Sequence, residues 1–410
     1  MSTPNVAIVT SGYLPVPNTQ GGAVEALDML LVDQNEKTGQ LDLVVYSAWD
    51  AEAARVAGRY RRTRFEFVKA PTLVRALDTV TYWGAKNLLR VRKNMSFRYI
   101  FQRLWYIRAV GARLAKVGHD AVVIENHATL FGVLRRRGNS ARYRGRVFFH
   151  LHNEVTRNFG SGGEIVTVKR VLGVSSYING TLQKRFPRMR GEQFAVLRNA
   201  VDATRFGTPD AEAEGRQLRA EWEVNDDDVV FLFSGRLTAE KGAEELLQAF
   251  VLADLSNAKL VIVGGYFFGT GLSSEFEQKL RALATQAGDR IVFTGFVPYE
   301  RMPAVYAAAD VCCLPSIWDD PAPLAVIEAV VAGKPLITTH SGGIPEYVND
   351  THAVVLDRGS RLVGAIRETM TRLDSDGVLR VAMGQAARQR RDQLSAGRLF
   401  DDFVKEIGRD

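Results

Sequence analysis

The chain has 410 residues, of which 46% are hydrophobic and 24% charged, a balance typical of a globular protein with two or three domains and unlike that of a disordered chain. Its net charge of +7 hides an asymmetry, because residues 1–200 contain 31 Lys and Arg against 14 Asp and Glu, whereas residues 201–410 contain 22 against 32. The two cysteines are adjacent, which excludes a disulfide framework, and no apolar run approaches the length of about 20 residues that spans a bilayer.

Short β-branched apolar runs alternate with helical patterns along the whole chain. The runs are continuous rather than alternating, which is typical of parallel strands covered by helices on both faces. We therefore predict the α/β class, with two Rossmann-like, doubly wound parallel-sheet domains. The predicted strands span residues 6–10, 43–46, 121–125, 146–150, 171–175 and 194–197 in the first half, and 229–234, 259–264, 291–294, 311–314, 335–339 and 353–356 in the second.

The two sets of strands are separated by a linker-like stretch near Val201–Asp210. We expect an N-terminal domain over residues 1–200 and a C-terminal domain over residues 201–394. Two such domains would face each other across a cleft, and each would bind ligands at the carboxyl ends of its strands. Their opposite charges predict different partners, and the basic first domain should attract an anionic one, such as a membrane surface, a lipid phosphate or a nucleic acid.

The cysteines and the N-terminus both favour an intracellular protein. Cys312 and Cys313 fall within the predicted strand at 311–314, so we expect them to be buried in a reducing compartment rather than to bind zinc. The first apolar run is too short for a signal peptide. These features predict a cytoplasmic protein, which can still contact the inner face of the cell membrane.

The most informative segment is Ser316–Ala329, which follows the strand at 311–314. Two prolines rigidify a loop, and a helix then begins near Leu324. The start of a helix offers free backbone N–H groups to anions and hydroxyls. Asp320 and Glu328 lie on either side of this helix start, where two carboxylates can bind two sets of vicinal hydroxyls, as on a sugar and a ribose.

A second motif, Ser234–Gly242, also follows a strand and precedes a helix. Its Arg236 and Lys241 would stand at the carboxyl end of the strand, where two cations suit a diphosphate. Gly-Gly pairs follow two other strands, at 21–22 and 342–343. Glycines allow close backbone approach to a phosphate, although a lone Gly-Gly pair is more often a turn.

Together these motifs resemble a known family. Gly-Arg-Leu-x3-Lys-Gly at 235–242, Asp-x7-Glu at 320–328 and Gly-Gly-Ile-Pro-Glu at 342–346 are similar in order and spacing to the retaining GT-B glycosyltransferases of family four. The likeness is specific over residues 231–348 and weaker over 6–202. It implies retaining transfer of a sugar from a UDP- or GDP-linked donor to an acceptor hydroxyl, without a cofactor, and a final helix, about 395–410, that returns to the first domain.

The resemblance also assigns roles to residues. Glu328 would bind the ribose hydroxyls, Asp320 the hydroxyls of the transferred sugar, and Phe296 would border the nucleobase. Arg236 and Lys241 would neutralise the diphosphate and act in catalysis with Asp320. The complete donor set is Gly22, Arg236, Lys241, Phe296, Asp320, Ala322, Pro323, Leu324 and Glu328. Asp320 replaces the family's usual Glu and Pro323 a common Gly, and both departures concern the subsite for the sugar.

Histidines mark the first domain. His150 and His152 end a predicted strand and point the same way, although a strand histidine is more often a core residue. The family has a histidine near its reaction centre at this place, and we favour His152 as the catalytic one. His127, at the end of the preceding strand, is assigned with Gly21 to the acceptor side, and a structural role for His127 is equally consistent.

Metal ligation is the main alternative for the acidic clusters. Asp319 and Asp320 form one cluster, and residues 226–228 form another at a turn that precedes a strand. The first is assigned to sugar binding, the second favours a solvated turn, and the two cations of the second motif already supply what Mg²⁺ would supply. We therefore predict no metal.

The segment Tyr82–Lys116 contains nine Lys or Arg, no acid, and several interleaved aromatics. It favours contact with an anionic membrane or lipid phosphate over two core helices with solvated arginines, and both over nucleic-acid binding. We expect a glycan or lipid-linked acceptor from envelope or exopolysaccharide assembly. Two other classes remain open: a GT-B nucleotide-sugar epimerase, and a non-catalytic membrane-associated adaptor with the same fold.

Overall fold

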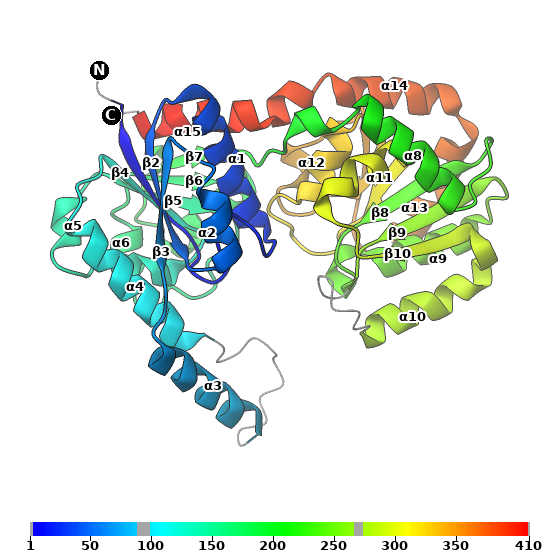
Figure 1. Cartoon of the computed structure of the whole chain (residues 1–410). Helices are drawn as coiled ribbons and strands as arrows, with labels where there is room; N and C mark the ends of the chain where they lie inside the picture. The colour runs from blue at the N-terminus through cyan, green and yellow to red at the C-terminus, as the bar shows by residue number, and fades with distance from the viewer. Residues whose placement is uncertain (1–2, 88–98, 266–273, 409–410) are drawn as a thin grey trace. The chain divides into compact units, whose positions relative to one another are not determined.

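The computed structural model describes residues 3–87, 99–265 and 274–408 (Figure 1). The chain divides into two units, each with its own core. Unit 1 comprises residues 1–197 and 399–410, and unit 2 comprises residues 198–398. The final helix, α15 (Ala396–Gly408), is tied into unit 1 by an ion pair of 2.5 Å between Arg170 Nη1 and Glu406 Oε2.

Unit 1 is built on a seven-stranded parallel sheet with the order β3-β2-β1-β4-β5-β6-β7. Its strands are β1 (Asn5–Val9), β2 (Asp42–Ala48), β3 (Thr63–Val68), β4 (Ala121–Glu125), β5 (Val147–Leu151), β6 (Arg170–Gly173) and β7 (Phe194–Val196). Its other helices are α1 (Ala23–Thr38), α2 (Ala51–Ala57), α3 (Thr72–Asn87), α4 (Ile100–Leu114), α5 (Asn139–Arg142), α6 (Gly162–Ile165) and α7 (Ser176–Arg185).

Strand β3 is the one strand of unit 1 that sequence analysis missed. It pairs with β2 alone, at the edge of the sheet. Its sequence, Thr-Arg-Phe-Glu-Phe-Val, alternates charged and apolar side chains. An edge strand is exposed more than a central one, so it lacks the continuous apolar run by which the other strands were predicted.

Unit 2 is built on a six-stranded parallel sheet with the order β10-β9-β8-β11-β12-β13. The strands are β8 (Val229–Ser234), β9 (Ala258–Val263), β10 (Ile291–Gly295), β11 (Val311–Leu314), β12 (Leu336–Thr339) and β13 (Ala353–Leu356). The helices are α8 (Pro209–Glu221), α9 (Ala243–Ala253), α10 (Glu275–Ala284), α11 (Met302–Ala308), α12 (Leu324–Val331), α13 (Leu362–Ser375) and α14 (Gly377–Arg388). All six predicted strands are present, and the predicted class of two parallel-sheet α/β domains is confirmed.

The core of unit 2 includes both cysteines. Cys312 and Cys313 are buried in β11, as predicted. Burial raises the pKa of both thiols, so neither is a reactive thiolate near pH 7.

Each sheet has one point at which the strand order reverses. In unit 1 this point lies between β1 and β4, and in unit 2 between β8 and β11. Loops that leave two such strands run in opposite directions and leave a crevice at the carboxyl edge, where open α/β sheets bind ligands. In unit 2 the loops that follow β8 and β11 are the two motifs singled out in the sequence, Ser234–Gly242 and Ser316–Pro323.

Candidate functional site

The two motif loops of unit 2 are bonded to each other. The backbone amide of Ile317 donates to Glu240 O at 3.0 Å, and Ser316 Oγ donates to the same oxygen at 3.2 Å. Gly242 has a φ of +74°, and a Cβ placed there would lie 1.9 Å from Pro315 O. A side chain would therefore force the loops apart, so Gly242 is required for their close approach.

This contact brings together Lys241 and Asp320, two residues predicted for the donor site. Lys241 Nζ lies 2.5 Å from Asp320 Oδ2, and only 21% and 8% of the two side chains are exposed. The ammonium also lies 5.6 Å from the ring centroid of Trp318. An ion pair of this kind leaves other Nζ–H bonds and carboxylate lone pairs for a ligand.

The glycine pair after β12, Gly342 and Gly343, is hydrogen-bonded to the loop that follows β11. Gly343 N donates to Asp320 O at 2.8 Å, and Gly342 N donates to Asp319 Oδ1 at 3.2 Å. A Cβ at Gly342, whose φ is +54°, would lie 2.4 Å from Asp320 O. Asp319 also pairs with Arg358 at 2.8 Å. The Gly-Gly turn therefore packs against the backbone of Asp319 and Asp320 and positions Asp320. The charge of Asp319 is already balanced by Arg358.

Glu328 lies within α12 and is buried. Tyr306 Oη donates to Glu328 Oε2 at 2.8 Å, and the Tyr299 hydroxyl also bonds to this carboxylate. Burial raises the pKa of Glu328, and the two tyrosines oppose this effect. The carboxylate is thus held by hydroxyl donors, the same chemical group that a ribose would offer. Sequence analysis missed both tyrosines, because no motif marks them.

The side chains of two remaining predicted donor residues, Arg236 and Phe296, are more exposed to solvent than those of Lys241, Asp320 and Glu328. Arg236 is half-exposed and lies 4.0 Å from Glu240, a weak surface pair. Phe296, which follows β10, is half-exposed. Pro323 is the N-cap of α12 and no side chain caps the helix, so its first amides lack intrahelical partners. Ala322 O accepts a bond of 3.1 Å from Asn199 Nδ2, which fixes the loop before the helix.

In unit 1, Glu125, His150 and His152 form a buried cluster at the ends of β4 and β5. Glu125 Oε1 lies 3.0 Å from His150 Nδ1, and Glu125 Oε2 lies 3.2 Å from His152 Nε2. The two ring nitrogens are 3.3 Å apart, close enough for the three side chains to hold a metal ion. Burial lowers the pKa of His152 to about 4, so this imidazole is neutral near pH 7. Sequence analysis singled out His152 but not its partner Glu125.

The other residues predicted in unit 1 surround the end of β1. Gly22 is the N-cap of α1, and a Cβ there would lie 2.3 Å from Glu25 Oε2. Glu25 is buried, accepts a bond of 2.7 Å from Ser11 Oγ, and has its pKa raised by burial. The start of α1, where the donor role of Gly22 is predicted, therefore already faces a carboxyl group. Gly21 has open space around it, and the ring of His127 lies against Tyr13 with centroids 5.9 Å apart.

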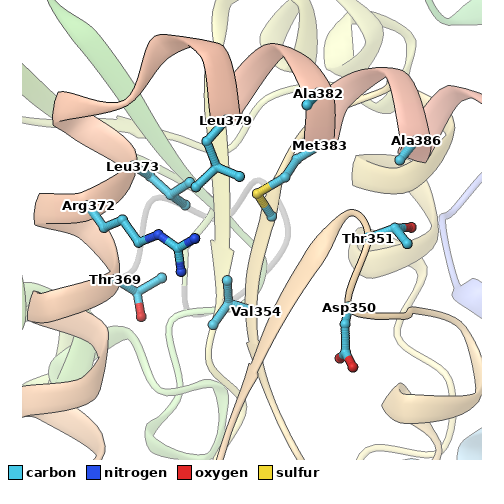
Figure 2. A pocket seen from close by; sticks show the side chains of 10 residues that line it. All are labelled: Asp350, Thr351, Val354, Thr369, Arg372, Leu373, Leu379, Ala382, Met383 and Ala386. Carbon is cyan, nitrogen blue, oxygen red and sulfur yellow. The ribbon is translucent and has the colours of Figure 1, made fainter.

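A cavity of about 340 Å³ in unit 2 lies apart from these residues, between β13, α13 and α14 (Figure 2). Figure 2 shows Leu373, Leu379 and Met383 directed toward its centre. Asp350 and Thr351, which line it, precede β13, so the cavity lies toward the amino ends of the strands. None of the predicted site residues lines it.

Comparisons with known proteins agree with the motifs. Residues 215–390 match the family described as glycosyl transferases group 1. Spore coat protein SA of Bacillus subtilis is 27% identical over 84% of this chain and 83% of its own length. A GDP-mannose-dependent alpha-(1-6)-phosphatidylinositol monomannoside mannosyltransferase of Mycobacterium tuberculosis is 34% identical over 57% of this chain and 59% of its own. The chain thus spans less than two thirds of the mannosyltransferase.

Solved structures show the same fold. Anabaena Alr3699/HepE in complex with UDP and glucose has a TM-score of 0.70 at 17% identity, covering 99% of both chains. A glycosyltransferase from Rickettsia africae has a TM-score of 0.74 at 14% identity, with the same coverage. The resemblance inferred from the motifs is confirmed for the second unit, which carries a group 1, family-four-like glycosyltransferase domain, and the chain as a whole has the GT-B fold.

Proposed function

We propose that this glycosyltransferase moves a sugar, with retention of configuration, from a nucleoside diphosphate sugar to an acceptor hydroxyl. The observation that carries the proposal is the pairing of Lys241 with Asp320 at the point where the strand order of unit 2 reverses. A cation, a carboxylate and an uncapped helix start occur there together, and Arg236 follows the neighbouring strand. These groups complement a diphosphate and a hydroxyl-rich sugar.

The proposed reaction follows from the groups present. The bond between the sugar C1 and the leaving phosphate oxygen breaks, and the acceptor oxygen bonds to C1 on the same face. The acceptor proton passes to the departing diphosphate oxygen. Negative charge grows on that diphosphate in the transition state, so Lys241 and Arg236 would stabilise the transition state more than the ground state. No carboxylate pair is then needed as nucleophile and acid–base catalyst.

For the donor we propose a UDP- or GDP-linked sugar. Structural neighbours are described in complex with UDP and with UDP-glucose, and relatives are named GDP-mannose-dependent. Glu328, with its hydroxyl partners, would bind the ribose that either nucleotide contains. Asp320 and Pro323 border the proposed subsite for the sugar, and their departure from the family pattern makes the sugar the most variable part of the donor.

A panel of UDP and GDP sugars in a thermal-shift experiment tests the donor, because a ligand at 100 times its Kd adds about 2.7 kcal/mol of stability. The stabilising donor is then incubated with and without lipid-linked glycan acceptors. Transfer to an acceptor supports the proposal. Free nucleotide with a rearranged sugar and no acceptor would identify an epimerase, and no turnover with any stabilising donor would identify an adaptor.

We expect the activity to be independent of divalent metal. Lys241 and Arg236 would supply the positive charge on the diphosphate, and Asp319 is already paired with Arg358. Transfer rates measured in excess EDTA and in Mg²⁺ or Mn²⁺ should therefore agree within about twofold. A rate restored only by added metal would contradict this expectation and would make Asp319 and Asp320 candidate ligands.

We further propose that unit 1 receives the acceptor at an anionic membrane, at the inner face of the cell membrane, through α3 and α4. No helix in residues 3–87, 99–265 and 274–408 could span a bilayer. Helix α3 instead projects from unit 1 and exposes apolar side chains at i, i+4, i+7 and i+10 (Figure 1). These four, here called the α3 apolar face, are Leu73, Leu77, Val80 and Trp83.

Not all basic residues of the segment Tyr82–Lys116 are available to a membrane. Arg103 is buried, where it donates to Ser11 O and Thr129 Oγ1, and Arg113 pairs with Glu66 at 3.2 Å. Arg103 therefore cannot face a membrane and Arg113 is engaged by Glu66, so contact with a bilayer would rest on the other basic residues of the segment Tyr82–Lys116. Arg108 of the segment is exposed, and so is Arg75, which precedes the segment in α3. Four further basic residues of the segment lie outside the described residues: Arg90, Arg92, Lys93 and Arg98.

Liposome sedimentation tests this surface. Binding should rise with anionic lipid and fall with salt, since each Lys or Arg near the surface contributes about 1 kcal/mol that is screened beyond about 8 Å. Changing both Leu77 and Trp83 to Glu should abolish it and leave the thermal shift by nucleotide intact. The matched control changes Val378 and Val381 to Glu, two exposed apolar residues of α14 in unit 2. Equal loss in the control, or equal binding to neutral liposomes, would contradict the proposal.

A further inference from the structure

Three buried polar side chains of unit 2 form a hydrogen-bonded series that ends at Glu328. Ser234 is the last residue of β8, Tyr306 lies in α11 and Glu328 lies in α12. Ser234 Oγ lies 2.8 Å from Tyr306 Oη, and Tyr306 Oη donates to Glu328 Oε2 at 2.8 Å. The exposed fractions of the three residues are 6%, 0% and 6%. The series therefore connects the first residue of one donor motif to the last residue of the other.

The direction of each hydrogen bond in the series follows from the chemistry of the groups. An ionised carboxylate can only accept, so the single hydroxyl proton of Tyr306 points to Glu328. Ala325 O is a competing acceptor, but it lies farther from Tyr306 Oη, at 3.3 Å, and carries no charge. Ser234 must then donate to Tyr306 Oη. Burial raises the pKa of Tyr306, so its hydroxyl keeps this proton near pH 7.

Tyr306 has no route of its own to a ligand. None of its surface is exposed, and its ring lies against that of Phe206 with centroids 5.9 Å apart. Glu328, at the end of the series, retains a small exposed surface and has carboxylate lone pairs beyond the one that Tyr306 occupies. Tyr306 can therefore influence a bound nucleotide only through Glu328.

We propose that Tyr306, supported by Ser234, is a positioning residue for nucleotide binding, because its hydroxyl fixes the carboxylate plane of Glu328 against the vicinal ribose hydroxyls. The last torsion of a glutamate side chain is broad, so without a donor on one oxygen this plane would rotate. The inference rests on the ribose role of Glu328 in the proposed function. The hydrogen-bonded series itself does not.

The other titratable or charged groups that face Glu328 differ from Tyr306. Tyr299 also bonds to the carboxylate, but it is 41% exposed and can itself contact a ligand. Arg205 lies behind Tyr299, with its guanidinium 4.9 Å from the centroid of that ring and bonded to Tyr299 O at 3.2 Å. Burial raises the pKa of the Cys312 thiol of β11 to about 12, so this thiol is neutral near pH 7. Tyr306 is thus the fully enclosed donor to Glu328.

The test compares a nucleoside diphosphate with an analogue that lacks both ribose hydroxyls. Isothermal titration calorimetry gives the ratio of the two Kd values for UDP or GDP and its dideoxy analogue. Tyr306→Phe removes one hydrogen bond to Glu328, so it should weaken binding of the ribose form and lower the ratio by roughly 3- to 10-fold. Binding of the dideoxy analogue should not change. Ser234→Ala should produce a smaller change in the same direction.

The matched control is Tyr143→Phe. Tyr143 is a fully buried tyrosine of unit 1 whose hydroxyl donates to Leu114 O at 2.6 Å. It should lower stability to a similar extent and leave the ratio of Kd values unchanged. A purely structural role of Tyr306 would weaken binding of both nucleotides equally, so the ratio separates positioning from packing.

A second measurement needs no ligand. Carbon NMR of protein labelled at its glutamate carboxyl carbons follows the titration of Glu328, whose signal is identified by its loss in Glu328→Gln. Tyr306 donates to the charged form of this carboxylate, so Tyr306→Phe should raise the pKa of Glu328 further. Nucleotide affinity should then begin to fall at a higher pH in this variant than in the wild type.

The proposal is overturned if Tyr306→Phe weakens both nucleotides equally, weakens neither, or leaves the pKa of Glu328 unchanged. Should Tyr306→Phe not fold, an unchanged ratio in Ser234→Ala overturns it. Glu328→Ala separates this inference from the proposed function. If that variant keeps the wild-type ratio, the ribose role itself fails. If it loses the preference for ribose while Tyr306→Phe keeps it, only the positioning role fails.

Discussion

Lys241→Ala is expected to lower kcat for sugar transfer by on the order of 10²- to 10³-fold, the loss typical when a preorganised group no longer stabilises charge in the transition state. The charge develops on the departing diphosphate, so kcat should fall more than the affinity for the donor. Steady-state kinetics with saturating donor, measured well below the melting temperature, would show it.

The same change should also lower the melting temperature. Without Lys241, the carboxylate of Asp320, of which 8% is exposed in the intact protein, loses its ion-pair partner, which is a larger penalty than the loss of a surface pair. The matched control is Lys279→Ala, which removes an exposed lysine of unit 2 that lies 2.6 Å from Glu244. The control should change kcat and stability little. If Lys241→Ala retains kcat within threefold of the wild type, Lys241 does not stabilise the leaving group.

Glu328→Ala is expected to weaken binding of the free nucleoside diphosphate as much as binding of the donor, because both contain the ribose. Loss of a charged hydrogen-bond acceptor costs about 1.5–3 kcal/mol, which corresponds to a Kd higher by roughly 10- to 150-fold. Isothermal titration calorimetry with UDP and GDP measures it. Glu277→Ala serves as the control, since Glu277 is a buried acid of α10 in the same unit, paired with Arg281 at 3.1 Å.

The affinity should also depend on pH. The ionised form of Glu328 is the better acceptor for two hydroxyls, and burial raises its pKa. Affinity should therefore fall with decreasing pH, beginning at a higher pH than an ordinary glutamate would cause, and Glu328→Gln should remove that dependence. Unchanged affinity in Glu328→Ala would refute the ribose role. Such a result would leave Glu328 as a purely structural partner of Tyr306 and Tyr299.

Much of unit 2 could be predicted from its sequence because its strands are buried on both faces. A strand such as Val229–Ser234 must be apolar throughout, and the polar residues that follow it must then lie at the carboxyl edge. Arg236, Lys241 and Asp320 are recognisable in this way, and Glu328 is recognisable by its spacing from Asp320 in the Asp-x7-Glu motif. Strand β3 could not be found by this signal, because an edge strand can alternate charged and apolar side chains instead of being apolar throughout.

The sequence by itself therefore determined the fold class, the family resemblance of the second unit and the candidate donor residues, since these depend on local patterns of burial and on motif spacing. The tertiary structure alone decided which of these residues meet. Lys241 and Asp320 are 79 positions apart and pair only because β8 and β11 are neighbours in the sheet. Arg103 lies in a basic segment yet is buried among backbone carbonyls and hydroxyls. Contacts of this kind depend on strand order and on which side of a helix faces the core, and neither is encoded in the residues near the contact.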